Sequence, residues 1–268
     1  MVRESVVDVK NYISPSGIGG VDFAVNPYVG CPHKCIYCYA EFMKRFTGHT
    51  EPWGDFIDAK RCPTPINLRK IAGKHVMLSS VTDPYNPYEK KYGITRRILE
   101  QLVHADCGVG ILTKSFLVVR DIDLFKKMRR VRVGVSMNSA DDEFRSAVEP
   151  YASGVPKRIE ALKRLHEAGV QTYLFMSPIF PGLSDVTRVI ASVWDFADEF
   201  SFENLKLRGA YKPRVLGFIK KNYPEYSGLY RTIYRERDNS YWREMSSLIE
   251  SYFEAREYRP YNIYFGAW

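Results

Sequence analysis

The sequence predicts an α/β fold, because short apolar runs typical of strands alternate with segments of helical periodicity. Strands that alternate with helices are typical of parallel βαβ units. The length of 268 residues fits one large domain or two small ones. Six strands are too few for a complete eight-stranded barrel, so the pattern leaves an open doubly wound sheet and a partial barrel as alternatives.

The elements follow one another in a regular order. The predicted strands are residues 21–28, 75–80, 108–113, 131–137, 170–176 and 202–207. Thr95 and Asp121 are typical N-cap residues and predict the starts of two helices. A third helix is predicted between Pro156 and Gly169, and a fourth after Ser184.

The composition is that of a soluble globular protein, with 45% hydrophobic and 26% charged residues. No run of 18 apolar residues occurs, so we expect no membrane partner. The N-terminal residues lack the pattern of a signal peptide, which predicts a cytoplasmic protein. The net charge of +8 favours a nucleic acid or another polyanion as partner, although a basic surface also serves solubility alone.

Three of the five cysteines form a C-x3-C-x2-C triplet of Cys31, Cys35 and Cys38. Thiolates suit iron–sulfur clusters and zinc. A [4Fe–4S] cluster usually takes four protein thiolates, so three would leave one iron open to bind a small molecule. Zinc is the alternative, but it requires four ligands, no second C-x2-C pair exists, and His33 could serve only with awkward geometry.

The triplet, with the aromatic Tyr37 before its last cysteine, resembles the signature of the radical SAM superfamily. Further segments resemble the spore photoproduct lyase-like, or DNA repair photolyase-like, branch of that superfamily. They are residues 79–85, 111–115, 120–121, 149–150, 158 and 178–185. The likeness extends from about residue 26 to residue 207, which is most of the chain.

This resemblance implies a partial (β/α)6 TIM-type barrel with a [4Fe–4S] cluster and S-adenosylmethionine (SAM) as cofactors. It implies an enzyme in which reductive cleavage of SAM gives a 5′-deoxyadenosyl radical that abstracts a hydrogen atom. The chemistry then belongs to the cofactors, and the protein supplies binding and orientation. An electron donor such as ferredoxin or flavodoxin would be a partner. In barrels the active site lies at the C-terminal ends of the strands, where the polar residues of this chain fall.

The resemblance also implies which residues contact SAM. Tyr37 would lie near the adenine, while Ser79, Ser80 and Asp83 would meet the methionyl amino group. The candidates for the carboxylate and the ribose, together with the residue that ends the third strand, are Lys114, Arg158, Ser136, Asn138 and Thr113. The alternatives are a turn at Asp83-Pro84 and a solvated helix face for Arg158. Glu149 receives no role.

The chain departs from spore photoproduct lyase at one position. That enzyme carries a hydrogen-donating cysteine shortly before the aspartate of its second-strand motif, and Ser80 stands there in this chain. Serine is a poor hydrogen-atom donor, because its O–H bond is much stronger than a thiol S–H bond. We therefore expect a member of this branch with a different substrate.

Two segments outside the strands differ from the rest of the chain in amino-acid composition. Residues 41–65 are rich in aromatics, Gly and Pro and are expected to shield the cluster. Residues 1–207 would form the core with its N-terminal lead-in, and residues 208–268 an aromatic, basic and helical extension packed on it. Arg and Tyr suit phosphate contact and base stacking, so nucleic acid is the first candidate substrate. Radical modification of a peptide or small metabolite, and a non-catalytic iron–sulfur or zinc module that binds nucleic acid, are the alternatives.

Overall fold

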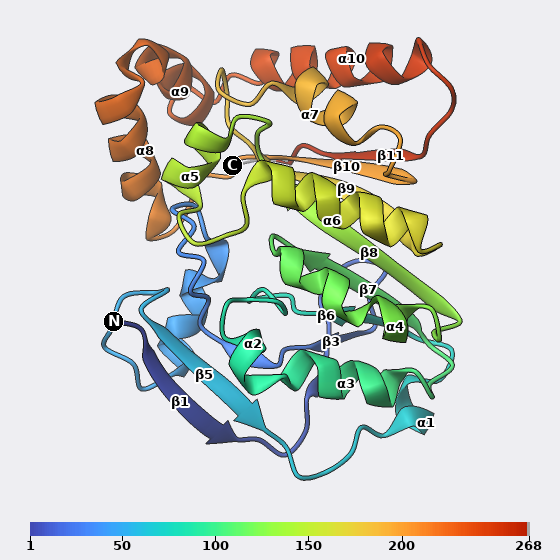
Figure 1. The fold of residues 1–268 in the computed structure, drawn as a ribbon. Helices are drawn as coiled ribbons and strands as arrows, with labels where there is room; N and C mark the ends of the chain where they lie inside the picture. Colours follow the sequence, from blue (N-terminus) through green and yellow to red (C-terminus); the bar gives the residue numbers. More distant parts are fainter. Residues whose placement is uncertain (267–268) are drawn as a thin grey trace.

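An eight-stranded, curved sheet forms the centre of the computed structural model, which describes residues 1–266 (Figure 1). The strand order is β11-β10-β9-β8-β7-β6-β3-β2, and every pair is parallel except β2 with β3. Their bounds are β2 Ile13–Pro15, β3 Phe23–Val25, β6 His75–Leu78, β7 Gly108–Thr113, β8 Arg130–Met137, β9 Gln171–Ile179, β10 Glu199–Asn204 and β11 Tyr261–Tyr264. In the described part of the chain β11 and β2 are the open edges, so the fold is a partial barrel, as predicted.

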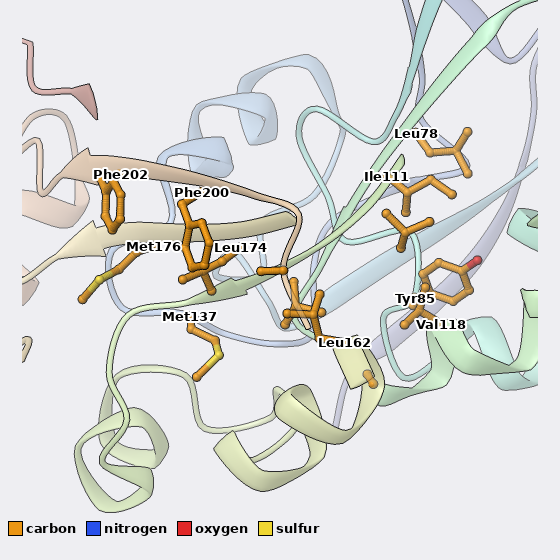
Figure 2. Packing of buried hydrophobic residues seen from close by; sticks show 14 of the residues in the cluster. Leu78, Tyr85, Ile111, Val118, Met137, Leu162, Leu174, Met176, Phe200 and Phe202 are labelled. Carbon is orange, nitrogen blue, oxygen red and sulfur yellow. The ribbon is translucent and has the colours of Figure 1, made fainter. Parts of the chain in front are cut away.

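Helices pack along the outer face of this sheet (Figure 1). They are α1 Leu68–Ile71, α2 Glu89–Tyr92, α3 Ile94–Leu102, α4 Ile122–Phe125, α5 Asp142–Val148, α6 Val155–Glu167 and α7 Val186–Val193, with the 3-10 helix η2 Phe116–Asp121. Another 3-10 helix, η1 Tyr39–Phe46, instead packs its buried Ala40 with Trp53 and Phe56. The core lies between helices and sheet and includes Leu78, Ile111, Leu162, Leu174 and Phe200, all buried (Figure 2). Burial of large apolar side chains supplies the main stabilisation of such a core.

A second, small sheet lies beside the barrel and consists of β1 Arg3–Asp8, β5 Phe56–Arg61 and β4 Tyr28–Val29. The first predicted strand, residues 21–28, is therefore divided between two sheets. Pro27 lacks the N–H that a continuing strand needs. The side chain of Asn26 instead accepts hydrogen bonds from the backbone N–H of Ser80 and Val81, at 2.9 and 3.3 Å. Because of this division, the residues after β4 leave the barrel sheet and form a loop at the mouth of the barrel.

Other predicted bounds also shift. The sixth barrel strand is Glu199–Asn204 and begins and ends three residues before the predicted 202–207. The fifth, β9, continues to Ile179 rather than ending at residue 176. The remaining barrel strands agree with the prediction within one or two residues.

Of the two predicted helix caps, Thr95 is wrong, whereas Asp121 does stand at the N-cap position of its helix. Helix α3 begins at Ile94, and the carboxylate of Glu89 accepts from the backbone N–H of Thr95 and Arg96 at 2.9 and 3.2 Å. Asp121 precedes α4 but makes no side-chain cap, because its carboxylate accepts from Tyr85, Arg96 and Arg120. The helix limits predicted from Pro156 and Gly169 are confirmed.

The segment after residue 207 supplies three helices and one strand. The helices are α8 Tyr211–Asn222, α9 Ser227–Tyr234 and α10 Ser240–Glu254, with a 3-10 turn η3 Pro224–Tyr226. Helix α10 lies beside α7, where the rings of Phe253 and Trp194 are 5.5 Å apart (Figure 1). The chain then returns as β11, which pairs in parallel with β10, so the extension is not purely helical. No helix among residues 1–266 is long and apolar enough to cross a membrane.

Candidate active site

The three clustered cysteines lie on one loop between β4 and η1. Cys31 is buried, Cys35 and Cys38 are partly buried, and all five cysteines are free thiols. Burial raises the pKa of Cys31 to about 12 and also raises the pKa of the other two thiols. Within residues 1–266 no three His, Cys, Asp or Glu side chains converge to hold a single metal ion.

Contacts from distant segments fix this loop. The backbone N–H of Ile36 donates to the carbonyl of Val148 at 3.0 Å, and the N–H of Tyr151 donates to the carbonyl of His33 at 3.3 Å. Arg214 of α8 donates to the carbonyl of Ile36 at 2.8 Å. The loop is therefore held by the C-terminal end of α5 and the residues that follow it, and also by the C-terminal extension.

Gly30, directly before Cys31, has a backbone conformation that favours glycine. Its φ is +85°, and a Cβ there would clash with the carbonyl oxygen of Phe56. Its own carbonyl accepts from the hydroxyl of Thr82 at 2.7 Å. These contacts set the position from which the cysteine loop starts.

An apolar cluster that is separate from the main core contacts two of the three cysteines. Its buried members are Cys31, Ala40, Trp53 and Phe56, with Cys38 packed against them. Trp53 and Phe56 belong to residues 41–65, the segment expected to shield the cluster, and they pack together with Cys31 and Cys38.

The predicted residues at the ends of β6 and β7 meet at Asp83. Its carboxylate accepts from the Thr113 hydroxyl at 2.6 Å and from the backbone N–H of Lys114 and Tyr85, both at 2.8 Å. The buried His33 ring lies 3.5 Å from the same carboxylate, and burial lowers its pKa. The turn interpretation is thus correct for Asp83, whose carboxylate also ties two neighbouring strands together.

Ser79 and Asn138 present buried polar atoms that have no hydrogen-bond partner within residues 1–266. The Ser79 hydroxyl and both polar atoms of the Asn138 amide are in this state. Ser79 also has a φ of +63°, which a non-glycine residue rarely adopts. Buried polar groups normally have partners, so such unpaired groups at the ends of β6 and β8 are typical of a ligand site.

Two other predicted serines are engaged in the chain itself. The Ser136 hydroxyl donates to the carbonyl of Ser177 at 3.3 Å. The Ser80 hydroxyl accepts from the Asn26 amide at 3.3 Å, and its carbonyl accepts from the hydroxyl of Tyr39. Both serines retain hydroxyl hydrogen-bonding capacity for a ligand.

A buried ion pair of Glu149 and Arg158 stands behind the cysteine loop. Both side chains are fully buried, and Arg158 also donates to the carbonyls of Ser136 and Ser153 at 2.8 and 2.7 Å. Burial opposes ionisation of Glu149, but Arg158 and Lys114 outweigh it and hold the pKa of the carboxyl below its ordinary value. The solvated-face alternative for Arg158 is therefore wrong.

Tyr37 and Lys114 complete this group. The Tyr37 hydroxyl donates to Glu149, and burial together with that carboxylate raises its pKa. Lys114 Nζ lies 5.9 Å from the centre of the Tyr37 ring. Burial opposes the charge of Lys114, but Glu149, Cys35 and Asp83 together outweigh burial and raise its pKa. Glu149 is the residue that the sequence reasoning missed, and only its place in the resembling segment 149–150 drew attention to it.

The described geometry can be compared with known proteins. The family model of the radical SAM superfamily matches residues 25–191, from the first barrel strand into α7. The chain belongs to the radical SAM superfamily. It is accordingly a radical SAM enzyme, which uses SAM and an iron–sulfur cluster.

Individual relatives agree with this assignment. An uncharacterized protein of Methanocaldococcus jannaschii is 38% identical over 220 residues, which are 82% of this chain and 83% of the relative. A radical SAM Nalpha-GlyT isomerase of Pseudomonas phage M6 is 27% identical over 161 residues, 59% of this chain and 33% of the relative. A spore photoproduct lyase variant with bound AdoMet and dinucleoside spore photoproduct has a TM-score of 0.70 and 16% identity, and the match covers 98% of this chain and 82% of that one. The resemblance to the spore photoproduct lyase-like branch is thus confirmed at the level of the fold.

Proposed function

We propose that Cys31, Cys35 and Cys38 hold a [4Fe–4S] cluster with one open iron, at which SAM binds for reductive cleavage and hydrogen-atom abstraction from a nucleic-acid substrate. The carrying observation is that three free thiols on one fixed loop lie at the same end of the barrel as unpaired buried polar atoms of Ser79 and Asn138. When bound, the cluster supplies one electron to the sulfonium of SAM.

The residues divide into contacts and supports for SAM. Ser79 and Asn138 are the best candidates for direct contact, because their side chains have unused donors and acceptors. Lys114 supplies a cation for the carboxylate, since no carboxylate forms an ion pair with it within residues 1–266. Tyr37, held by Glu149, suits the adenine, and the hydroxyls of Ser80, Ser136 and Thr113 remain candidates.

Asp83 and Arg158 act mainly as supports in this proposal. Asp83 already accepts three short hydrogen bonds, and Arg158 donates to two carbonyls and pairs with Glu149. A side chain whose donors or acceptors are occupied fixes its neighbours more effectively than it binds a new group. Asp83 therefore orients Thr113 and Lys114, and Arg158 orients Glu149 and the end of β8.

Three observations support nucleic acid as substrate. The chain carries a net charge of +8, which attracts polyanions. A spore photoproduct lyase of similar fold binds a dinucleoside. Exposed aromatic side chains lie at Tyr39, directly after Cys38, and at Tyr264 on β11. Ser80 replaces the donor cysteine of that lyase, so the proposed reaction differs from dimer repair through a thiol. Ferredoxin or flavodoxin remains the proposed electron donor.

The first experiment tests cluster and SAM chemistry. The full chain is reconstituted anaerobically with iron and sulfide, reduced with dithionite in the presence of SAM, and assayed for 5′-deoxyadenosine by mass. Formation is expected in the wild type and in Cys62→Ala, a half-buried cysteine outside the triplet, and loss is expected in Cys35→Ala. A loaded cluster without SAM binding or product, even with candidate substrates added, would contradict the proposal.

A second experiment tests the substrate class. Binding of single- and double-stranded DNA and RNA is measured across a series of salt concentrations. A nucleic-acid enzyme should lose affinity linearly on a log–log plot, because phosphate contacts release counterions. Equal, salt-insensitive weak binding of all nucleic acids would direct the search to peptides or small metabolites.

A further inference from the structure

The indole of Trp53 lies against the third cysteine of the triplet. Its Nε1 is 3.2 Å from the Sγ of Cys38. An indole N–H can only donate a hydrogen bond, so the sulfur must be the acceptor. The same sulfur also accepts from the backbone N–H of Ala40, which leaves Trp53 as its side-chain donor among the described residues.

Trp53 is held in this position by its own surroundings. Only 8% of its surface is exposed. Its ring packs edge-on against Phe56, with the ring centres 5.6 Å apart, and Phe56 is stacked on His49 at 3.9 Å. His49 is in turn anchored to Asp58 at 2.9 Å. The N–H is thus aimed at the sulfur by a buried stack rather than by a mobile surface loop.

The residue after Trp53 makes this turn specific. Gly54 has a φ of +94°, and a Cβ there would clash with the side chain of Lys34 in the cysteine loop. Glycine therefore lets the Trp53 segment approach the cysteine loop closely. Gly54 and the packing of Trp53 together place the indole N–H on the sulfur of Cys38.

We propose that Trp53 is a positioning residue that raises the reduction potential of the cluster held by the three cysteines. This rests on the proposed [4Fe–4S] site. One electron enters on reduction and no proton is required, so negative charge on the thiolates increases. A hydrogen bond to a thiolate stabilises that extra charge, and hydrogen bonds to cluster sulfurs are a recognised determinant of potential.

The test compares wild type, Trp53→Phe and Trp194→Phe, each reconstituted as the full chain. Trp194 is a matched control, because it is half-buried among aromatic rings at α10, away from the cysteines. Iron and sulfide content is measured first, and the potential is then obtained by dithionite titration followed by electron paramagnetic resonance without SAM. We expect Trp53→Phe to shift the potential downward by about 59 mV, a tenfold change in the reduced fraction for one electron. Trp194→Phe should leave it unchanged.

The outcomes separate this inference from the proposed function. Failure of the wild type to bind four irons would overturn the [4Fe–4S] site itself. Equal potentials in wild type and Trp53→Phe, with full clusters in both, would overturn only the role of Trp53. If Trp53→Phe does not load a cluster, Trp53 is replaced by benzothienylalanine, which keeps the indole shape without the N–H. A lowered potential in that protein supports the proposal, and an unchanged one refutes it.

Discussion

The two ends of the barrel differ in whether their polar side chains are exposed and have partners. At the N-terminal ends of the strands, the Tyr173 side chain reaches across neighbouring strands, donates to the carbonyl of Ile111 at 2.8 Å, and carries Arg132 over its ring. Arg132 is half-exposed and pairs with Glu199 at 3.2 Å. At the opposite end Arg158 is fully buried, and the side chains of Ser79 and Asn138 have no partner in residues 1–266.

The difference indicates that polar groups at one end of the barrel stabilise the fold, whereas polar groups at the other end are available to bind a ligand. At the N-terminal ends one aromatic ring reaches across neighbouring strands and the charged groups are solvated, so their interactions are each worth little. The mouth buries an ion pair and leaves other groups unpaired, which costs stability unless a ligand completes them. The following predictions test this contrast, from the largest expected effect to the smallest.

Glu149→Gln should have the largest effect on stability. It leaves the buried Arg158 without its counter-charge, which typically costs about 3–5 kcal/mol. The free energy of unfolding of the metal-free protein by urea measures this. Glu160→Gln is the control, because Glu160 pairs with Arg164 on an exposed face of α6 and should cost at most about 0.5 kcal/mol. Equal losses in both variants would show that the mouth pair is no more important than a surface pair.

Gly134→Ala tests the packing of the Tyr173 ring at the N-terminal end of the barrel. A Cβ at residue 134 would clash with the ring of Tyr173, so overpacking should lower the free energy of unfolding by about 1–3 kcal/mol. Gly110→Ala on the neighbouring strand is the control, because the nearest atom, the Val76 carbonyl oxygen, would be 4.0 Å away. Similar unfolding energies for the two variants would mean that Tyr173 adjusts and that its ring is not tightly packed.

Asn138 and Asn204 form a matched pair at the mouth. Both are buried, but the Asn204 amide donates to the carbonyl of Gly266 at 3.0 Å and accepts from its N–H at 3.3 Å. Asn204→Leu should therefore cost about 1–3 kcal/mol, whereas Asn138→Leu should cost nothing in the metal-free protein.

SAM binding should show the opposite order. We expect Asn138→Leu to weaken SAM binding to the reconstituted protein at least about tenfold, which corresponds to about 1.4 kcal/mol. Asn204→Leu should change the dissociation constant little if it folds. Destabilisation by Asn138→Leu together with normal SAM affinity would assign Asn138 to structure alone.

The sequence predicted those parts of the site that depend on local spacing. The cysteine triplet could be found from its spacing, and the polar residues near the ends of β6, β7 and β8 from the resemblance of their segments to the family. Glu149 and Arg158 could not be paired, because nothing in the local pattern shows that two residues on either side of a helix start will meet in the interior. Burial, rather than residue type, decides their role.

Contacts between segments far apart in the sequence could not be predicted either. The strand β11 carries the alternating aromatic and apolar pattern of Tyr261 and Ile263, but its position in a mostly helical extension concealed it. The hydrogen bond from Trp53 to Cys38 was also outside reach, although a shielding segment was expected. Both are contacts between segments that periodicity within one element does not report.

Arg214→Met should have the smallest effect and tests the link between the extension and the cysteine loop. The Arg214 side chain is partly exposed, donates to the Ile36 carbonyl and pairs with Glu41, both at 2.8 Å, so its loss should cost at most about 1 kcal/mol. The sensitive measurement is the rate of cluster loss in air, which should increase because the loop between Cys35 and Cys38 loses a contact. Lys220→Met, an exposed residue near the end of α8, is the control and should match wild type. If Arg214→Met also matches wild type, the contacts of Val148 and Tyr151 hold the loop sufficiently without the extension.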